Sequence, residues 1–158
     1  MFFEIGGYPD QEQELIITAL GNKELFPQVE KLISNAPKLK DWNFIALKPS
    51  QGSKFVTRYE DVELDPQNMW FLPLDNTKQP ELLGLKLFTN NFNQEKKRQF
   101  LAASYILLDT ILGERSSGLD ISYVDIDKLP ENPEEKGMIE LPDLPKYLAW
   151  HQSKIKKE

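Results

Sequence analysis

Cysteine is absent from the 158 residues of the chain, and the only histidine is His151. Without cysteine, disulfides, thiolate metal sites and cysteine nucleophiles are excluded. A single histidine rules out the HExxH zinc motif, and any serine–histidine–acid triad would have to include His151. The glycine patterns of dinucleotide-binding and P-loop proteins are missing as well. We therefore expect no catalytic residue set, no cofactor and no metal ion.

Long hydrophobic runs are also missing. The most apolar stretch, residues 100–108, is interrupted by Ser104 and is far shorter than the roughly 18 residues that a membrane span needs. Residues 1–8 contain no basic residue, so we expect no secretory signal there. These features predict a soluble, cytoplasmic protein that does not bind membranes.

The composition is that of a folded protein. Hydrophobic residues make up 40% of the chain and charged residues 28%, both close to the average of globular domains. A chain of this length fits one domain and buries enough surface to fold without metals or disulfides. We expect a single α+β domain over residues 1–158.

Negative charge is concentrated in one segment. The formal net charge is −6, and residues 109–143 alone contribute −7 because they contain ten acids and three bases. An acidic surface repels phosphate backbones, which argues against nucleic-acid binding. The segment either keeps the protein in solution or binds a basic protein partner.

The hydrophobic pattern predicts helices and strands in a mixed order. Leu101, Tyr105, Leu108 and Leu112 recur at helical spacing and predict a long core helix over about residues 94–112, ended by Gly113. A shorter helix is expected between a strand at 14–20 and a strand at 42–47. Further strands are expected over the following ranges: 54–59, 69–72, 84–89 and 119–126.

The C-terminal part changes character. Residues 129–145 contain four prolines and many acids, which is typical of a semi-rigid connector. Residues 144–156 then predict a short amphipathic helix that packs on its own domain or on a second copy. The element order favours a two-layer α+β sandwich, with a mostly antiparallel sheet and two main helices on one face. A ferredoxin-like variant is the specific topology expected.

Part of the chain resembles a known group of proteins. The motifs are a strand over residues 15–20 followed by Gly21-Asn22, a Glu-Leu-Phe-Pro helix start at 24–27, Ala36-Pro37-Lys38-Leu39 and a strand led by Trp42. Together with Leu112-Gly113-Glu114, they resemble a group of small uncharacterised bacterial proteins. The resemblance covers about a third of the chain and implies a bacterial origin and a compact fold, but no activity.

Six residues are candidates for a function. Asp109 interrupts an apolar helix, where burial would raise its pKa as a general acid requires, and Glu114 follows the end of the same helix. Asp125 and Asp127 lie on one face of a strand, although they lack the ligand spacing of a calcium or magnesium site. Trp150 and His151 lie on the C-terminal helix.

Two hypotheses about function remain. The first is a non-enzymatic protein-interaction module, such as an acidic adaptor or immunity-like protein, which binds a basic partner or self-associates through its C-terminal helix. The second is a carboxylate-based hydrolase or another metal-assisted enzyme. The scarcity of histidine, cysteine and phosphate-binding loops favours the first.

Overall fold

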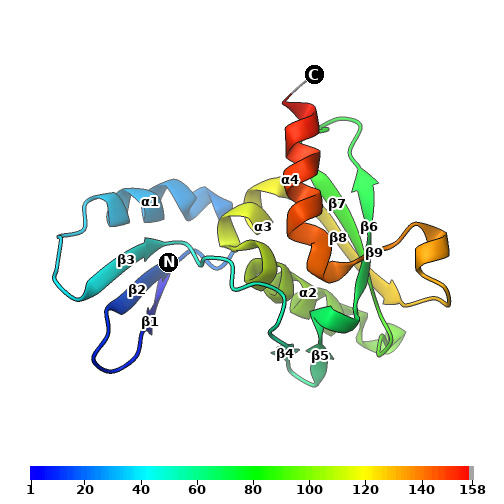
Figure 1. The fold of residues 1–158 in the computed structure, drawn as a ribbon, viewed down its shortest axis with the longest axis horizontal. Helices are drawn as coiled ribbons and strands as arrows, with labels where there is room; N and C mark the ends of the chain where they lie inside the picture. Colours follow the sequence, from blue (N-terminus) through cyan, green and yellow to red (C-terminus); the bar gives the residue numbers. More distant parts are fainter. Residues whose placement is uncertain (157–158) are drawn as a thin grey trace.

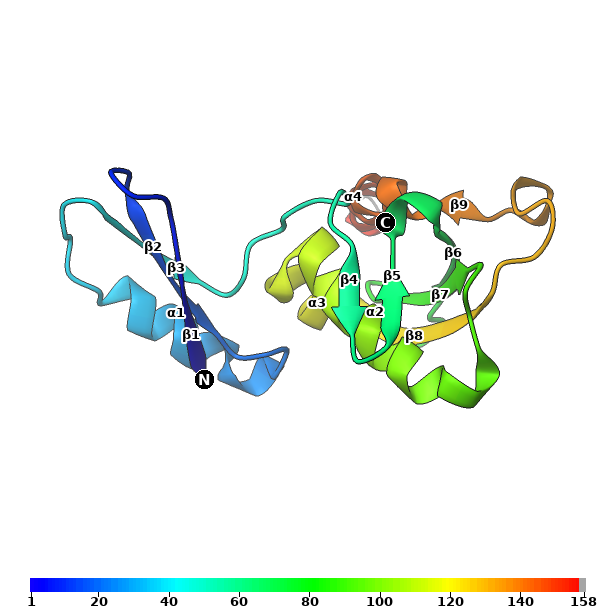
Figure 2. The same ribbon diagram turned by 90° about the horizontal axis from the view of Figure 1, so that it is seen from below.

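The chain folds into two lobes that lie side by side (Figures 1 and 2). The computed structural model describes residues 1–156; the expected single domain over 1–158 thus includes two residues outside the described part. We call residues 1–47 the N-terminal lobe and residues 57–156 the C-terminal lobe, and residues 48–56 the linker. Each lobe has its own cluster of buried hydrophobic side chains.

The N-terminal lobe is a three-stranded sheet with one helix. The order of strands is β1 (Phe2–Gly6), β2 (Gln13–Thr18) and β3 (Trp42–Ala46). β1 and β2 form an antiparallel hairpin, whereas β2 and β3 are parallel and are joined by helix α1 (Phe26–Ser34), preceded by a 3-10 turn, η1 (Lys23–Leu25). A parallel pair needs such a crossover because its strands run in the same direction.

The core of this lobe is small. Its buried hydrophobic side chains are Ala19, Phe26, Val29 and Leu47. α1 packs against the β2 and β3 side of the sheet, so no residue of β1 is buried.

The C-terminal lobe contains six short strands and three helices. The strands are β4 (Thr57–Tyr59), β5 (Val62–Leu64), β6 (Trp70–Asp75), β7 (Leu83–Thr89), β8 (Ile121–Lys128) and β9 (Ile139–Glu140). β4 and β5 form a separate hairpin, and the other four form a sheet in the order β8-β7-β6-β9. The helices are α2 (Lys97–Leu112), α3 (Glu114–Asp120) and α4 (Leu144–Ile155). Short 3-10 turns lie at Pro66–Asn68, Gln94–Lys96, Glu134–Lys136 and Leu141–Asp143.

A single large core holds the C-terminal lobe together. Strand register places Phe71, Leu87 and Ile126 side by side on one face of the sheet. Leu107 and Leu108 from α2, with Leu144 and Leu148 from α4, belong to the same buried cluster. The C-terminal helix therefore docks on its own chain.

The α+β class is confirmed, and most strand pairs are antiparallel. The expected single ferredoxin-like sheet is not found, because the strands divide among three sheets. The physical reason lies in the two parallel pairs, β2–β3 and β7–β8. Each pair requires its own helical crossover, so each crossover helix packs on its own sheet.

Two segments near the C-terminus have clear structural roles. The long helix expected over 94–112 is present as a 3-10 turn followed by α2, and the helix expected over 144–156 is α4. The proline-rich segment 129–145 contributes β9, which pairs with β6, and the buried side chains of Met138 and Leu141. Among residues 1–156, no helix has both the length and the apolar character needed to cross a membrane.

The core position of Leu108 gives a direct test of the fold. Leu108 is fully buried, so Leu108→Ala should lower the free energy of unfolding by about 2–5 kcal/mol through lost burial and a cavity. Urea denaturation measures the loss. The exposed Leu119 is the matched control, and Leu119→Ala should change stability by no more than about 0.5 kcal/mol. Equal losses would contradict the packing of α2.

Candidate functional site

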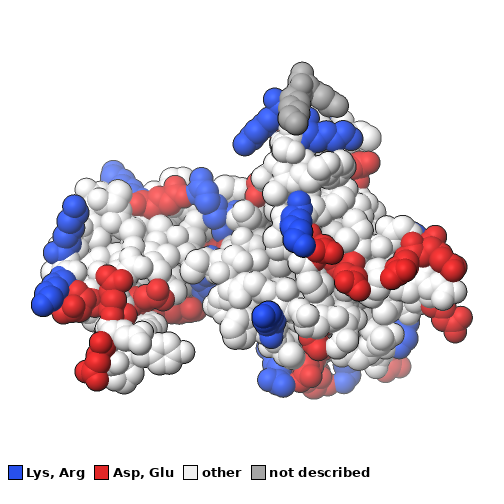
Figure 3. All heavy atoms as spheres, in the orientation of Figure 1, with Lys and Arg blue, Asp and Glu red and all other residues white. Residues whose placement is uncertain are grey.

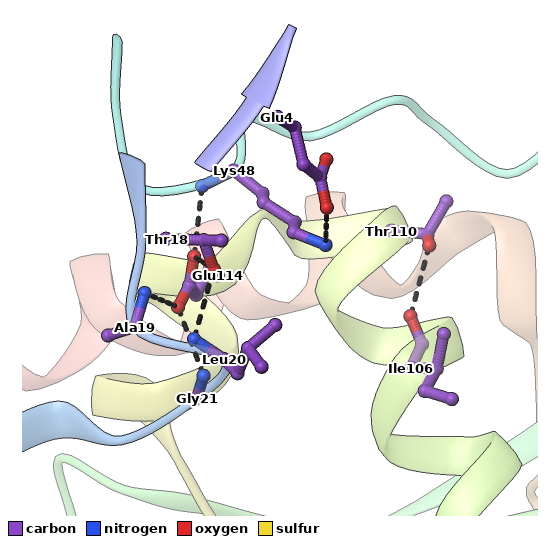
Figure 4. Close-up of polar contacts among 9 residues, drawn as sticks. All are labelled: Glu4, Thr18, Ala19, Leu20, Gly21, Lys48, Ile106, Thr110 and Glu114. Atoms are coloured by element: carbon purple, nitrogen blue, oxygen red, sulfur yellow. Dashed lines mark hydrogen bonds and ion pairs between the residues drawn. The ribbon is translucent and has the colours of Figure 1, made fainter. Parts of the chain in front are cut away.

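A buried carboxylate joins the two lobes. The side chain of Glu114, the first residue of α3, is fully buried. The N–H groups of Ala19 and Gly21 donate hydrogen bonds to its Oε1 at 2.9 and 3.0 Å, and the Thr18 hydroxyl and the Lys48 N–H donate to its Oε2 at 2.7 and 3.0 Å (Figure 4). A carboxylate has about four acceptor sites. Glu114 is therefore saturated by donors from the N-terminal lobe and the linker.

Two of these donor N–H groups follow strained loop residues. Leu20 and Leu47 have φ angles of 51° and 62°, in the left-handed region that residues other than glycine rarely adopt. Each directly precedes a donor N–H, that of Gly21 or Lys48. Such a conformation costs about 1–3 kcal/mol per residue, so it persists only where other contacts hold it. The hydrogen bonds to Glu114 are those contacts.

Gly113 lets the linker approach the end of α2. Its φ is 82°, and a Cβ at this position would lie 3.0 Å from the Ser50 nitrogen. The close approach allows the Ser50 hydroxyl to donate to the Ile111 carbonyl at 2.6 Å and the Gln51 N–H to donate to the Thr110 carbonyl at 2.8 Å. The linker thus caps carbonyls that the end of α2 would otherwise leave unpaired.

Two further contacts cross the junction. The Phe26 ring lies where a Cβ on Gly118 would sit, 2.8 Å from its nearest atom, so α3 needs glycine at this point. At the surface, Arg115 forms an ion pair with Glu30 of α1. Exposed ion pairs contribute at most about 1 kcal/mol, so the buried contacts dominate.

Asp109 lies beside this junction and is only partly buried. Burial raises the pKa of Asp109, and the charge of Glu114 raises it further, whereas a hydrogen bond with Ser117 and the charge of Lys48 partly oppose the rise. Among the described residues, Asp109 takes part in no ion pair. The fold therefore holds a carboxylate in a place where its charge is unfavourable.

Asp109 lines a cleft between the lobes. The cleft consists of two hollows of about 280 and 460 Å³, and both are lined by Leu20, Tyr105 and Asp109. Leu20 comes from the N-terminal lobe, and Tyr105, Ile106 and Asp109 come from α2. The side chains of Leu20, Tyr105 and Ile106 are exposed. The cleft therefore combines this apolar surface with the carboxylate of Asp109, and Lys23 and Glu24 also line the larger hollow.

The other two candidate acids lie elsewhere, on the far edge strand β8. Lys97 binds Asp125 at 2.8 Å and Lys86 binds Asp127 at 3.0 Å. Burial raises the pKa of Asp125, but the hydrogen bonds from Lys97 and the Ile126 N–H, together with the charges of Lys97 and Lys86, outweigh burial and leave this pKa below its usual value. Across residues 1–156, no three Asp, Glu or His side chains gather closely enough to hold a metal ion. The acids of segment 109–143 are thus divided among the junction, ion pairs and exposed loops.

Trp150 and His151 line a separate hollow of about 330 Å³ beside α4. His151 is buried, and its Nδ1 has no hydrogen-bond partner among the described residues. Trp150 is half exposed and packs against Tyr147, with the Lys154 ammonium over its ring. Burial raises the pKa of Tyr147, and the nearby charge of Asp75 adds to the effect. The structure does not bring this pair close to the four candidate acids.

The exposed apolar strand β1 was not predicted from the sequence pattern. Phe2, Phe3 and Ile5 of β1 are 60%, 67% and 63% exposed. Residues 2–6 are too short and too apolar to show the alternation of a half-buried strand. The only sequence signal for an exposed apolar strand was the presence of three large apolar residues within residues 2–5.

Comparison with protein-family models finds none that matches the chain, and searches among curated proteins and solved structures give no significant match.

The role of Glu114 can be tested by an isosteric substitution. Glutamine keeps one acceptor oxygen and replaces the other with an NH₂ group, so two of the four donors lose their acceptor. Each unsatisfied buried donor costs about 1–3 kcal/mol, and Glu114→Gln should lower the free energy of unfolding by about 2–6 kcal/mol in urea denaturation. Glu30→Gln removes a surface contact between the same lobes and should cost at most about 1 kcal/mol. Similar costs for both variants would disprove the role of Glu114.

Asp109 should reduce stability at neutral pH. Its pKa is raised above the ordinary value of 3.8, so the unfolded chain releases this proton at lower pH than the folded protein. Stability therefore falls as pH rises through that interval and stays lower above it. Thermal melts of Asp109→Asn should show a higher Tm than the wild type at pH 7, and the gain should vanish below pH 3.8. Asp61→Asn is the control, because the pKa of Asp61 is shifted in the opposite direction: a hydrogen bond from Lys96 lowers it. The Tm of this variant should not rise at pH 7.

Proposed function

We propose that this protein is a non-enzymatic interaction module that binds an extended, basic segment of a partner protein along strand β1. The observation that carries the proposal is the exposure of Phe2, Phe3 and Ile5 on a strand at the end of its sheet. Burial of such side chains against a partner stabilises a complex by about 25 cal/mol per Å² of apolar area.

An end strand offers hydrogen-bonding groups as well as apolar area. One edge of β1 has no neighbouring strand among the described residues, so alternate N–H and C=O groups point outward. Edge strands are normally protected by lysine, proline or a bulge. β1 reads Phe-Phe-Glu-Ile-Gly and has none of these, and its single charge, Glu4, is paired with Lys48. The strand is therefore suited to strand addition by a partner.

The negative charge around β1 favours a basic partner. Residues 1–22 contain four acids and no lysine or arginine; the acids are Glu4, Asp10, Glu12 and Glu14. Only Glu4 has an ion-pair partner in the described part of the chain. In Figure 3, drawn in the orientation of Figure 1, acidic atoms gather at the lower end of the N-terminal lobe, where the β1–β2 turn lies. A second copy would bring like charges together, whereas a basic segment would supply the opposite charge.

The enzyme hypothesis has less support. Glu114 is saturated by donors, and Asp125 and Asp127 are each paired with a lysine. A general acid or a metal ligand needs free carboxylate oxygens at a shared site. Asp109 is the one candidate acid that lines the cleft, and no lysine or arginine in the described part of the chain forms an ion pair with it.

Synthetic peptides test the proposal. An eight-residue peptide of alternating lysine and valine, labelled for fluorescence anisotropy, should bind, whereas its glutamate–valine counterpart should not. A triple variant, Asp10→Lys, Glu12→Lys and Glu14→Lys, should bind the basic peptide at least about tenfold more weakly, because each surface ion pair contributes about 0.2–1 kcal/mol and its reversal adds repulsion.

The matched control reverses three exposed acids of the C-terminal lobe, namely Glu131, Glu134 and Glu135, and should leave the affinity within about twofold. Equal losses in both triple variants, or equal binding of both peptides, would refute docking on the hairpin. A wild-type dimer with protected β1 amides would show that a second copy occupies the strand.

A further inference from the structure

The cleft between the lobes adjoins strand β1. Glu4 of β1 lines the smaller hollow together with Lys48 of the linker and Tyr105, Ile106 and Asp109 of α2. Figure 4 shows Glu4 and Lys48 between β1 and α2. A segment that pairs with β1 therefore has a path into this cleft.

Two side chains of α2 combine an aromatic face with a carboxylate. Tyr105 and Asp109 are four residues apart, which places them on the same face of the helix with Cβ atoms about 5–6 Å apart. Tyr105 is 53% exposed, and both residues line both hollows of the cleft. Leu20 lies opposite, on the N-terminal lobe, and is also exposed.

The aromatic ring of Tyr105, the carboxylate of Asp109 and the apolar side chain of Leu20 are suited to binding an arginine side chain. A guanidinium group is planar, always charged, stacks on aromatic rings and binds a carboxylate through two N–H donors. Its three-carbon stem packs on apolar surface such as that of Leu20. Lys48, whose charge acts on Asp109, is itself paired with Glu4, and no ion pair to Asp109 forms within residues 1–156. We infer that Tyr105 and Asp109 form a binding site for an arginine side chain of the partner segment.

The energetic cost of Asp109 supports this assignment. Burial and the charge of Glu114 raise the pKa of Asp109, so its ionised form reduces the stability of the free protein at neutral pH. A bound guanidinium group would relieve this cost by supplying the missing positive charge. The inference rests on the proposed function, because it names a specificity-determining contact of the same partner segment.

Three capped peptides test the inference on the wild-type protein. Each consists of valine and lysine in alternation and differs only at one central position, which is arginine, lysine or citrulline, the uncharged analogue of arginine. NMR titration should show shifts at the amides of Leu20, Asp109 and Ser117 with the arginine peptide. Affinity should fall about two- to fivefold for lysine, which loses stacking, and about tenfold or more for citrulline, which loses the charge.

Variants then assign the effect to Asp109. Asp109→Asn should weaken the arginine peptide about tenfold and leave the citrulline peptide within about twofold, so the arginine preference disappears. Asp120→Asn, an acid at the end of α3 that lines neither of these two hollows, should keep the preference. Tyr105→Leu should reduce the preference for arginine over lysine.

The outcomes separate this inference from the proposed function. Shifts confined to the amides of residues 2–6, with equal affinity for arginine and citrulline, would overturn the arginine site while supporting docking on β1. A preference for arginine that survives Asp109→Asn would also overturn it. No shift at β1 or in the cleft would contradict both proposals.

Discussion

The Glu114 carboxylate is the constraint on which the arrangement of the molecule depends. It accepts four hydrogen bonds, three from backbone N–H groups and one from a hydroxyl, and residues 1–156 offer it no cationic partner. Donors of this kind can replace water around a buried carboxylate only if all of them are held in place. That requirement explains the left-handed conformations of Leu20 and Leu47 and the fixed position of the linker. The small N-terminal lobe, with four buried hydrophobic side chains, is therefore held against the C-terminal lobe mainly by one residue.

This junction also shapes the proposed binding surface. With the lobes held in place, the exposed strand β1 and the cleft of α2 form one path, acidic along the hairpin and apolar at Leu20, Tyr105 and Ile106. Asp109 lies at the end of this path, where its charge reduces the stability of the free protein. Residues that cost stability are retained where a function uses them, which is consistent with a partner that supplies positive charge.

The sequence predicted the parts of the fold that depend on local pattern. The apolar repeat over residues 94–112 and the amphipathic stretch at the C-terminus both correspond to helices. It did not predict the division into three sheets, because parallel pairing depends on contacts between distant segments. Asp109 was identified as a candidate because it interrupts an apolar helix, and Glu114 because it follows the end of that helix. The four donors to Glu114 come from residues 66 to 96 positions away, and no local pattern reveals contacts at such separation. β1 was missed because its side chains are exposed and show no burial pattern.

Hydrogen exchange of the wild-type protein tests the central role of Glu114 most directly. The amides of Ala19, Gly21 and Lys48 all donate to this carboxylate, although they belong to two separate loops. If Glu114 joins the lobes, these three amides should exchange through one common opening, with the same free energy and the same dependence on denaturant. Separate opening energies, or exchange of these amides as fast as that of the exposed β1 edge, would contradict the account.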